Sequence, residues 1–254
     1  MKVVIFCGGR GSRLNEFTEE IPKPLVEIGN KPVLWHIMKI YSAYGFKDFI
    51  LCLGYKGEKI KDYFIKSDWR ENDFTLKEGK IEHHSKRHED WTITFVDTGQ
   101  DTNKAERLVK VRSYLADEED FFVTYGDDVS DVNLIELLEF HKRNGKIATI
   151  TTNRPENPYG IIELQGDLVI NFREKPIMEQ WVNSGFFVFN KRIFENINPT
   201  EDLEKEVFKR LYEKGEIIAF KNFGFWKGMN TFKDTQELNE YWKNKSAKWK
   251  KWMD

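Results

Sequence analysis

Glycines and cations follow directly after the first apolar run of the chain. Residues 2–7 (KVVIFC) are typical of a short buried strand, and they lead into a loop formed by Gly8, Gly9, Arg10, Gly11, Ser12 and Arg13. Glycines let a backbone approach a phosphate closely, backbone N–H groups donate to its oxygens, and the two arginines add positive charge. The loop therefore predicts a phosphate site, and a turn with incidental arginines is the alternative.

The two common phosphate-binding fingerprints do not fit this loop. The dinucleotide pattern needs a glycine where Leu14 stands, and the P-loop needs Gly-Lys-Ser/Thr in sequence. A G-x-S-x-G nucleophile context is also missing from the sequence, so covalent acyl chemistry has no support. We therefore expect a phosphate cradle of another class.

A lysine close to the loop has the right character to join it. Lys23 lies between Pro22 and Pro24, which restrict the backbone and present the side chain on a rigid segment. A lysine held this way suits a phosphate. The alternative is an ordinary surface lysine in a proline turn.

Carboxylates follow the predicted strand 121–125. Asp127 and Asp128 come at its carboxyl end, where they are well placed to hold Mg²⁺ against a triphosphate, because this ion takes hard oxygen ligands and keeps several waters. Asp131 precedes an apolar helix and is expected to cap it. His83, His84 and His88 have no cysteines beside them, so we expect a solvated loop there and not a zinc site.

The elements that would position these residues alternate between strand and helix. We predict strands at 2–7, 48–53, 91–96 and 121–125, and helices at 31–44, 56–64, 103–115 and 132–144. Beyond residue 145 the pattern is α+β, with strands at 146–152, 160–164, 168–173, 185–189 and 217–220 and helices at 203–214 and 235–245. This order predicts an α/β protein with a mostly parallel sheet covered on both faces. We expect a single domain, 1–254, with a nucleotide-binding part at about 1–150 and an acceptor-binding part at about 151–254.

The composition limits the classes of partner that the protein is expected to bind. Forty basic and 42 acidic residues give a net charge of −2, so no global basic field favours nucleic acid or an anionic membrane. Cys7 and Cys52 lie in apolar runs and are expected as buried thiols. No signal peptide or membrane span is evident, and we expect a cytoplasmic protein. The tail carries Trp242, Trp249 and Trp252 among lysines; a helix docked through its tryptophans is favoured over membrane or nucleic-acid binding.

Seven segments, taken in order, resemble the sugar-phosphate nucleotidyltransferases, and within them the branch that transfers CMP to glucose-1-phosphate. They are CGGRGSRL, IPKPLVEIGNKPVLWHIMKIY, DTG at 97–99, YGD at 125–127, FREKP at 172–176, NSGFFVF at 183–189 and GFWKGMNT at 224–231. The resemblance implies a doubly wound, Rossmann-like nucleotidyltransferase core with a small α+β acceptor-binding part, a Mg²⁺ cofactor and a homo-oligomer.

The resemblance also implies residue roles. Nucleotide binding falls to Gly8, Gly9, Arg10, Gly11, Ser12, Arg13, Lys23, Arg107, Gly126 and Asp127. Catalysis falls to Arg13, Lys23 and Lys175. The acceptor would contact Tyr125, Glu174, Lys175 and Asn183. The metal would lie on Asp127 and on Asn230, where the family pattern has an aspartate; the amide weakens the site, and Asp128 is the candidate that compensates.

The implied reaction is the transfer of CMP from MgCTP to a small phosphorylated acceptor with release of pyrophosphate, giving a CDP-linked precursor for surface polysaccharide. Two departures from the family pattern bear on the identity of the acceptor. The first is residues 103–106 (NKAE), where the family has a glycine pair and where Glu106 is expected to pair with Arg107. The second is residues 177–182 (IMEQWV), which place Glu179 beside the expected acceptor pocket. They leave glucose-1-phosphate and phosphorylated L-glutamine open as acceptors. Alternatives are a nucleotide-binding module with weakened catalysis, or an enzyme that uses UTP or dTTP.

Overall fold

A seven-stranded sheet forms the centre of the molecule. The computed structural model describes residues 1–9, 20–71, 73–84 and 89–253. The strand order is β14-β10-β13-β8-β1-β4-β7. The strands are β14 (Ile217–Lys221), β10 (Ala148–Asn153), β13 (Val182–Asn190), β8 (Asp120–Tyr125), β1 (Lys2–Phe6), β4 (Asp48–Leu53) and β7 (Thr92–Asp97). Only β13 runs antiparallel to its neighbours in this sheet. The predicted α/β class and the mostly parallel mixed sheet are confirmed.

Helices cover both faces of this sheet, because its central strands are apolar on both sides. Val3 and Ile5 of β1 pack with α2 (Val33–Ala43), α5 (Leu134–Asn144) and α7 (Phe232–Lys243). Val4 and Phe6 face the opposite way and pack with α4 (Lys104–Lys110) and α6 (Phe208–Glu213). Cys7 and Cys52 are buried free thiols, as expected. The helix α3 (Gly57–Glu71) follows β4.

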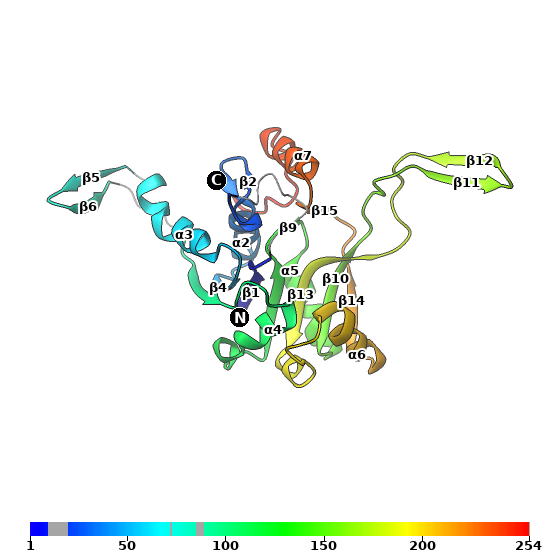
Figure 1. The fold of residues 1–254 in the computed structure, drawn as a ribbon, viewed down its shortest axis with the longest axis horizontal. Coiled ribbons are helices and arrows are strands. Elements are labelled where there is room, and N and C mark those ends of the chain that lie inside the picture. The colour runs from blue at the N-terminus through cyan, green and yellow to red at the C-terminus, as the bar shows by residue number, and fades with distance from the viewer. Residues whose placement is uncertain (10–19, 72, 85–88, 254) are drawn as a thin grey trace.

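Two hairpins extend from opposite ends of the molecule (Figure 1). One is β5 (Phe74–Lys77) with β6 (Lys80–His83), where a loop was expected. The other is β11 (Ile161–Gln165) with β12 (Leu168–Arg173). A bridge between Glu156 and Ile177 closes its base, and we call residues 155–178 the arm. Small two-stranded pairs join β2 (Glu27–Ile28) to β3 (Lys31–Pro32), and β9 (Asp128–Ser130) to β15 (Trp226–Gly228).

Several predicted boundaries need correction. The expected helix 103–115 ends at Lys110, and a 3₁₀ turn, η3 (Arg112–Leu115), follows it. The expected helix 203–214 begins as a π-helical turn, η5 (Leu203–Val207). Asp131 does not cap α5; the Asn133 carboxamide does, since its Oδ1 accepts from the backbone N–H groups of Ile135 and Glu136 at 3.1 and 3.2 Å.

The tail docks through its tryptophans, as expected, but not all of these tryptophans lie on a helix. α7 ends at Lys243, so Trp249 and Trp252 lie beyond the helix. Trp249 is fully buried, and its indole N–H donates to His36 Nδ1 on α2 at 3.4 Å. The ring of Trp242 lies 4.6 Å from that of His36. Across the described residues, no helix has the length and apolar character needed to cross a bilayer.

Candidate active site

A cavity of about 520 Å³ opens where β1 and β8 end. This is the edge of a parallel sheet at which α/β proteins bind ligands. The described residues that line it come from segments far apart in sequence: Phe6, Cys7, Gly8, Gly9, Lys23, Pro24, Thr102, Asn103, Lys104, Arg107, Tyr125, Gly126, Asp127, Asp202 and Asn230. Gly126 allows a close approach there, since a Cβ on it would lie 2.8 Å from the Phe6 carbonyl oxygen.

Lys23, Asp127 and Asn230 meet in this cavity. Lys23 begins the 3₁₀ turn η2 (Lys23–Leu25), with Pro22 as its N-cap and Pro24 inside it. Its Nζ donates to Asp127 Oδ2, and to Asn230 Oδ1 at 3.1 Å. The Asp127 carbonyl accepts from the Met229 backbone N–H at 2.9 Å, which ties the turn after β8 to the segment after β15. The structure therefore brings together Lys23 and Asp127, two residues that the resemblance assigns to nucleotide binding.

Asp128 occupies a different position from Asp127. It is 6% exposed and is not among the described residues that line the cavity. Its carboxylate packs against two glycines, because a Cβ on Gly185 or on Gly228 would lie 2.6 Å from one of its oxygens. Burial, together with the charge of Asp127, raises the pKa of Asp128 well above its usual range.

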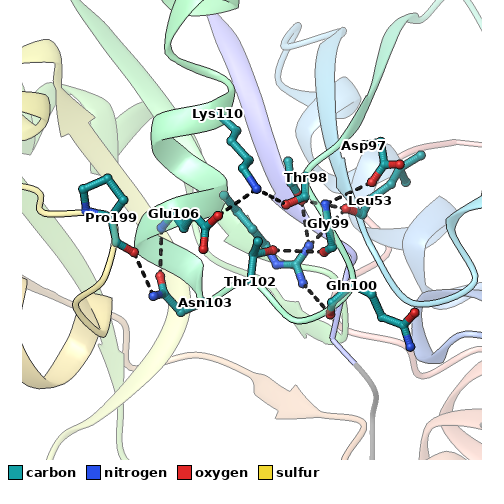
Figure 2. Close-up of polar contacts among 11 residues, drawn as sticks. Leu53, Asp97, Thr98, Gly99, Gln100, Thr102, Asn103, Glu106, Lys110 and Pro199 are labelled. Atoms are coloured by element: carbon teal, nitrogen blue, oxygen red, sulfur yellow. Dashed lines mark hydrogen bonds and ion pairs between the residues drawn. The ribbon is translucent and has the colours of Figure 1, made fainter.

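Arg107 is buried next to Gly8, at the end of β1, and Figure 2 labels several residues of its surroundings, among them Leu53, Thr98 and Gln100. Its guanidinium donates to the Leu53 carbonyl at 3.0 Å, to Thr98 Oγ1 at 2.7 Å and to the Gly8 carbonyl at 3.1 Å. A Cβ on Gly8 would lie 2.0 Å from Nη1, so only glycine fits there. Arg107 thus fixes the ends of β1, β4 and β7 relative to one another while also lining the cavity.

The expected pair between Glu106 and Arg107 is wrong. Glu106 Oε1 binds Lys110 Nζ at 2.7 Å instead, as the dashed line in Figure 2 marks. Neighbours i and i+1 point to different sides of a helix, whereas i and i+4 lie on the same face. The burial of Arg107 lowers the pKa of its guanidinium.

The predicted acceptor residues divide into two groups. Tyr125 lines the cavity, and Asn183 Nδ2 donates to its hydroxyl at 3.2 Å. Glu174 and Lys175 lie on the arm and are exposed, and neither is among the described residues that line the cavity. Lys175 has a φ of 45°, and Glu179 is likewise exposed just beyond the arm. Arg10, Gly11, Ser12 and Arg13 lie outside the described residues.

Seven of the described cavity residues were not predicted as site residues: Phe6, Cys7, Pro24, Thr102, Asn103, Lys104 and Asp202. Asn103 and Lys104 were noticed only as departures from a glycine pair, and Asp202 was not noticed at all. Asp202 caps η5, since its Oδ1 accepts from the Glu204 and Lys205 backbone N–H groups at 3.0 and 2.9 Å. Lys104 carried a signal, since the segment 103–106 departs from the glycine pair that the resemblance leads one to expect before Arg107. The sequence around Asp202 gave no indication of a site beyond the pattern of a helix N-cap.

The oxygen ligands in the cavity fit Mg²⁺ bound together with a nucleotide. Asp127 offers a carboxylate and Asn230 an amide carbonyl. Among the described residues, no group of three or more histidines, cysteines or carboxylates could hold a metal without a ligand's help. Mg²⁺ is commonly bound by one or two carboxylates, waters and substrate phosphates, so this small set is sufficient for it. The Lys23 ammonium, which is itself a cation, is bound to Asp127, the carboxylate that would hold the metal.

Comparison with known proteins defines the class that this fold and site represent. A family model described as nucleotidyl transferase matches residues 2–250. The chain belongs to the nucleotidyl transferase family, and it is an enzyme of that class.

Individual relatives cover the whole chain. It is 44% identical over 256 residues to the glucose-1-phosphate cytidylyltransferase of Salmonella typhi, which covers 99% of this chain and 100% of that protein. It is 40% identical over 256 residues to a probable glucose-1-phosphate cytidylyltransferase of Bacillus subtilis, with the same coverage. The solved structure of HddC from Yersinia pseudotuberculosis, 22% identical, superposes with a TM-score of 0.71 over 95% of this chain and 99% of that one, and so supports the fold.

Proposed function

We propose that this enzyme transfers CMP from MgCTP to glucose-1-phosphate and releases pyrophosphate. The main support is the meeting of Lys23 and Asp127 at the carboxyl ends of β1 and β8, beside the glycine loop. The names of the full-length relatives support CTP as the donor and glucose-1-phosphate as the acceptor. Phosphorylated L-glutamine has weaker support, because the names of these relatives give glucose-1-phosphate as the acceptor.

The reaction needs no protein nucleophile. A phosphate oxygen of the acceptor attacks the α-phosphorus of CTP, and the bond from that phosphorus to the bridging oxygen of pyrophosphate breaks. Two polyanions must be held together while charge builds up, so catalysis comes mainly from positioning and from cations. Mg²⁺ bound at Asp127 and Asn230 would neutralise part of the phosphate charge.

Lys23 would change partners in this scheme. Its ammonium lies on Asp127 and Asn230. Mg²⁺ held by Asp127 would supply the positive charge there, and Lys23 would then donate to a phosphate oxygen of CTP. Arg13 is assigned to the triphosphate by resemblance.

We assign Glu174 and Lys175 to the cavity of a neighbouring copy in a homo-oligomer. Within one chain the arm extends away from the sheet (Figure 1). The arm also leaves large apolar side chains in water, with Leu168 66%, Leu164 60% and Phe172 58% exposed. Soluble proteins seldom leave such a patch uncovered, and a second copy would cover it.

Pyrophosphate release tests the reaction. Each of CTP, UTP, dTTP and GTP would be incubated with Mg²⁺ and either glucose-1-phosphate or phosphorylated L-glutamine. We expect release with CTP and glucose-1-phosphate, together with formation of CDP-glucose. Release with UTP or dTTP alone would contradict the base assignment, release with phosphorylated L-glutamine alone would contradict the acceptor, and no release with any pair would contradict both.

A further inference from the structure

One wall of the cavity contains an ion pair that has no role in the scheme above. Lys104 begins α4, Tyr125 ends β8, and Glu204 lies in the π-helical turn η5. Glu204 Oε1 accepts from the Tyr125 hydroxyl and is paired with Lys104 Nζ. The same Nζ lies 4.9 Å from the centre of the Tyr125 ring, a distance at which cation–π attraction acts. Tyr125 and Lys104 both line the cavity, whereas Glu204 supports them from η5.

Asn183 completes this wall from a fourth element. Its Nδ2 donates to the Tyr125 hydroxyl at 3.2 Å, and its Oδ1 accepts from the Gly185 backbone N–H at 2.9 Å. Burial and the neighbouring Glu204 raise the pKa of Tyr125, so the phenol keeps its proton and remains a donor to Glu204. These contacts hold the wall together within the chain, and they leave the Lys104 ammonium with donors to spare, because it carries three and Glu204 Oε1 accepts from one side of it.

Lys104 lies beside a residue that the resemblance assigns to the acceptor. Its ammonium lies over the ring of Tyr125, which carries that assignment together with Asn183. Gly8, Gly9 and the buried Arg107 line the same cavity and are assigned by the resemblance to the nucleotide, and Arg107 donates to the Gly8 carbonyl. A nucleotide held by these three residues would leave the surroundings of Tyr125 for the organic part of the acceptor.

We propose that Lys104 is a specificity-determining residue that donates hydrogen bonds to hydroxyl oxygens of a sugar phosphate, and that Glu204 is a positioning residue that holds it. This assignment rests on the proposed function. Charge gives a second reason for a cation here. Asp202 and Glu204 bring two carboxylates to this wall, and without Lys104 their field would repel a phosphorylated acceptor.

A purely structural role would predict little effect of removing this lysine. The Lys104 side chain is 36% exposed, and ion pairs with that much exposure contribute little to stability. An effect confined to one substrate therefore separates recognition from folding.

The test compares Lys104→Met with Lys104→Arg, and uses Lys209→Met as the matched control. Lys209 is an exposed lysine of α6 whose nearest acid, Glu213, lies 4.0 Å away. Steady-state rates would be measured with CTP and glucose-1-phosphate varied separately. We expect Lys104→Met to raise the KM for glucose-1-phosphate by about tenfold or more, since a hydrogen bond from a charged group is lost. The KM for CTP should change less than about twofold, Lys104→Arg should recover part of the loss, and Lys209→Met should match the wild type.

Glu204→Gln should raise the same KM by a smaller factor, because it frees Lys104 without removing it. An unchanged KM for glucose-1-phosphate in Lys104→Met, or an equal rise for both substrates, would overturn the assignment. Calorimetric binding of glucose-1-phosphate tests Lys104 independently of turnover. A wild type that binds the sugar phosphate but releases no pyrophosphate would overturn the proposed function, and weaker binding by Lys104→Met would then still support the assignment.

Discussion

The ammonium of Lys23 is bonded to the carboxylate of Asp127, although the two residues lie 104 positions apart in the chain. The contact is possible because η2 passes across the carboxyl ends of β1 and β8, where Asp127 begins the turn. It places a cation beside the carboxylate that we propose as a metal ligand.

Removing the Lys23 charge should affect the chemical step. We expect Lys23→Met to lower kcat by about 10²- to 10³-fold, the usual loss when one group that stabilises transition-state charge is removed. Asp127 would lose its partner, so thermal melting is measured in parallel to confirm that the variant folds. A variant that keeps more than half of the wild-type kcat would contradict the role given to Lys23.

The two neighbouring aspartates should differ in their effect on Mg²⁺. Asp127→Asn should raise the Mg²⁺ concentration needed for half-maximal rate by at least about tenfold, because a charged ligand is lost. Asp128→Asn, its matched control, should leave that concentration unchanged, because Asp128 is buried with a raised pKa. A similar shift in both variants would show that Asp128 contributes to the metal site after all.

Asp128 should also make the stability of the folded protein depend on pH in a defined direction. Its pKa is raised in the folded protein, so the folded state binds the proton more tightly than the unfolded chain does. Its contribution is therefore most favourable below the unfolded pKa and declines as pH rises towards the folded pKa. At neutral pH we expect Asp128→Asn to melt at the same or a higher temperature than the wild type, and a lower one would contradict this.

His36 should make the stability of the folded protein depend on pH in the opposite direction. Burial lowers its pKa from 6.5 to about 4, so the unfolded chain takes up the proton first as the solution is acidified. The stability from neutral His36 is complete above about pH 6.5 and is lost as pH falls towards 4, by an amount of the order of 3 kcal/mol. Urea unfolding between pH 4.5 and 7.5 measures this slope. The control is His36→Phe, which keeps His141; an equal slope in both proteins would exclude His36 as the cause.

Lys175 and Lys23 should complement each other between chains. If the arm serves a neighbouring cavity, Lys175→Ala and Lys23→Ala should each be nearly inactive as pure oligomers. After they are mixed, dissociated and reassociated, some cavities would receive Lys23 from one chain and Lys175 from another, and activity should return to a fraction of about a quarter. Activity that stays at the level of the pure variants would place both residues in one chain's site, and a monomer in sedimentation would contradict the assembly.

The sheet was largely predictable because its strands carry a strong pattern. β4 has the predicted bounds, residues 48–53, and β1 differs by one residue. The pair of β9 with β15 was not predictable, since it joins two three-residue strands almost 100 positions apart. The missed hairpin of β5 and β6 did leave a signal: Glu78 and Gly79 both have positive φ, and an X-Gly pair between short strands is typical of a tight turn.

The site was predictable where motifs lie next to regular elements. Lys23 begins η2 and Asp127 follows the end of β8, and both line the cavity. Lys175 stands in a motif but also on a projecting hairpin, and no residue pattern states how far such a hairpin extends. The contact of Lys104 with Glu204 depends on a π-helical turn, whose hydrogen bonds cannot be distinguished in sequence from those of an α-helix.

The burial of Trp249 against His36 links the order of synthesis to the order of folding. A growing chain that has been made only as far as α5 already contains β1, β4, β8 and α2, but it lacks the indole that fills the space beside His36. The early half therefore emerges with part of its apolar surface in water. We expect the first half to complete its packing only after the last residues have been made, and a product truncated before Trp249 to be a substrate for chaperones and proteases.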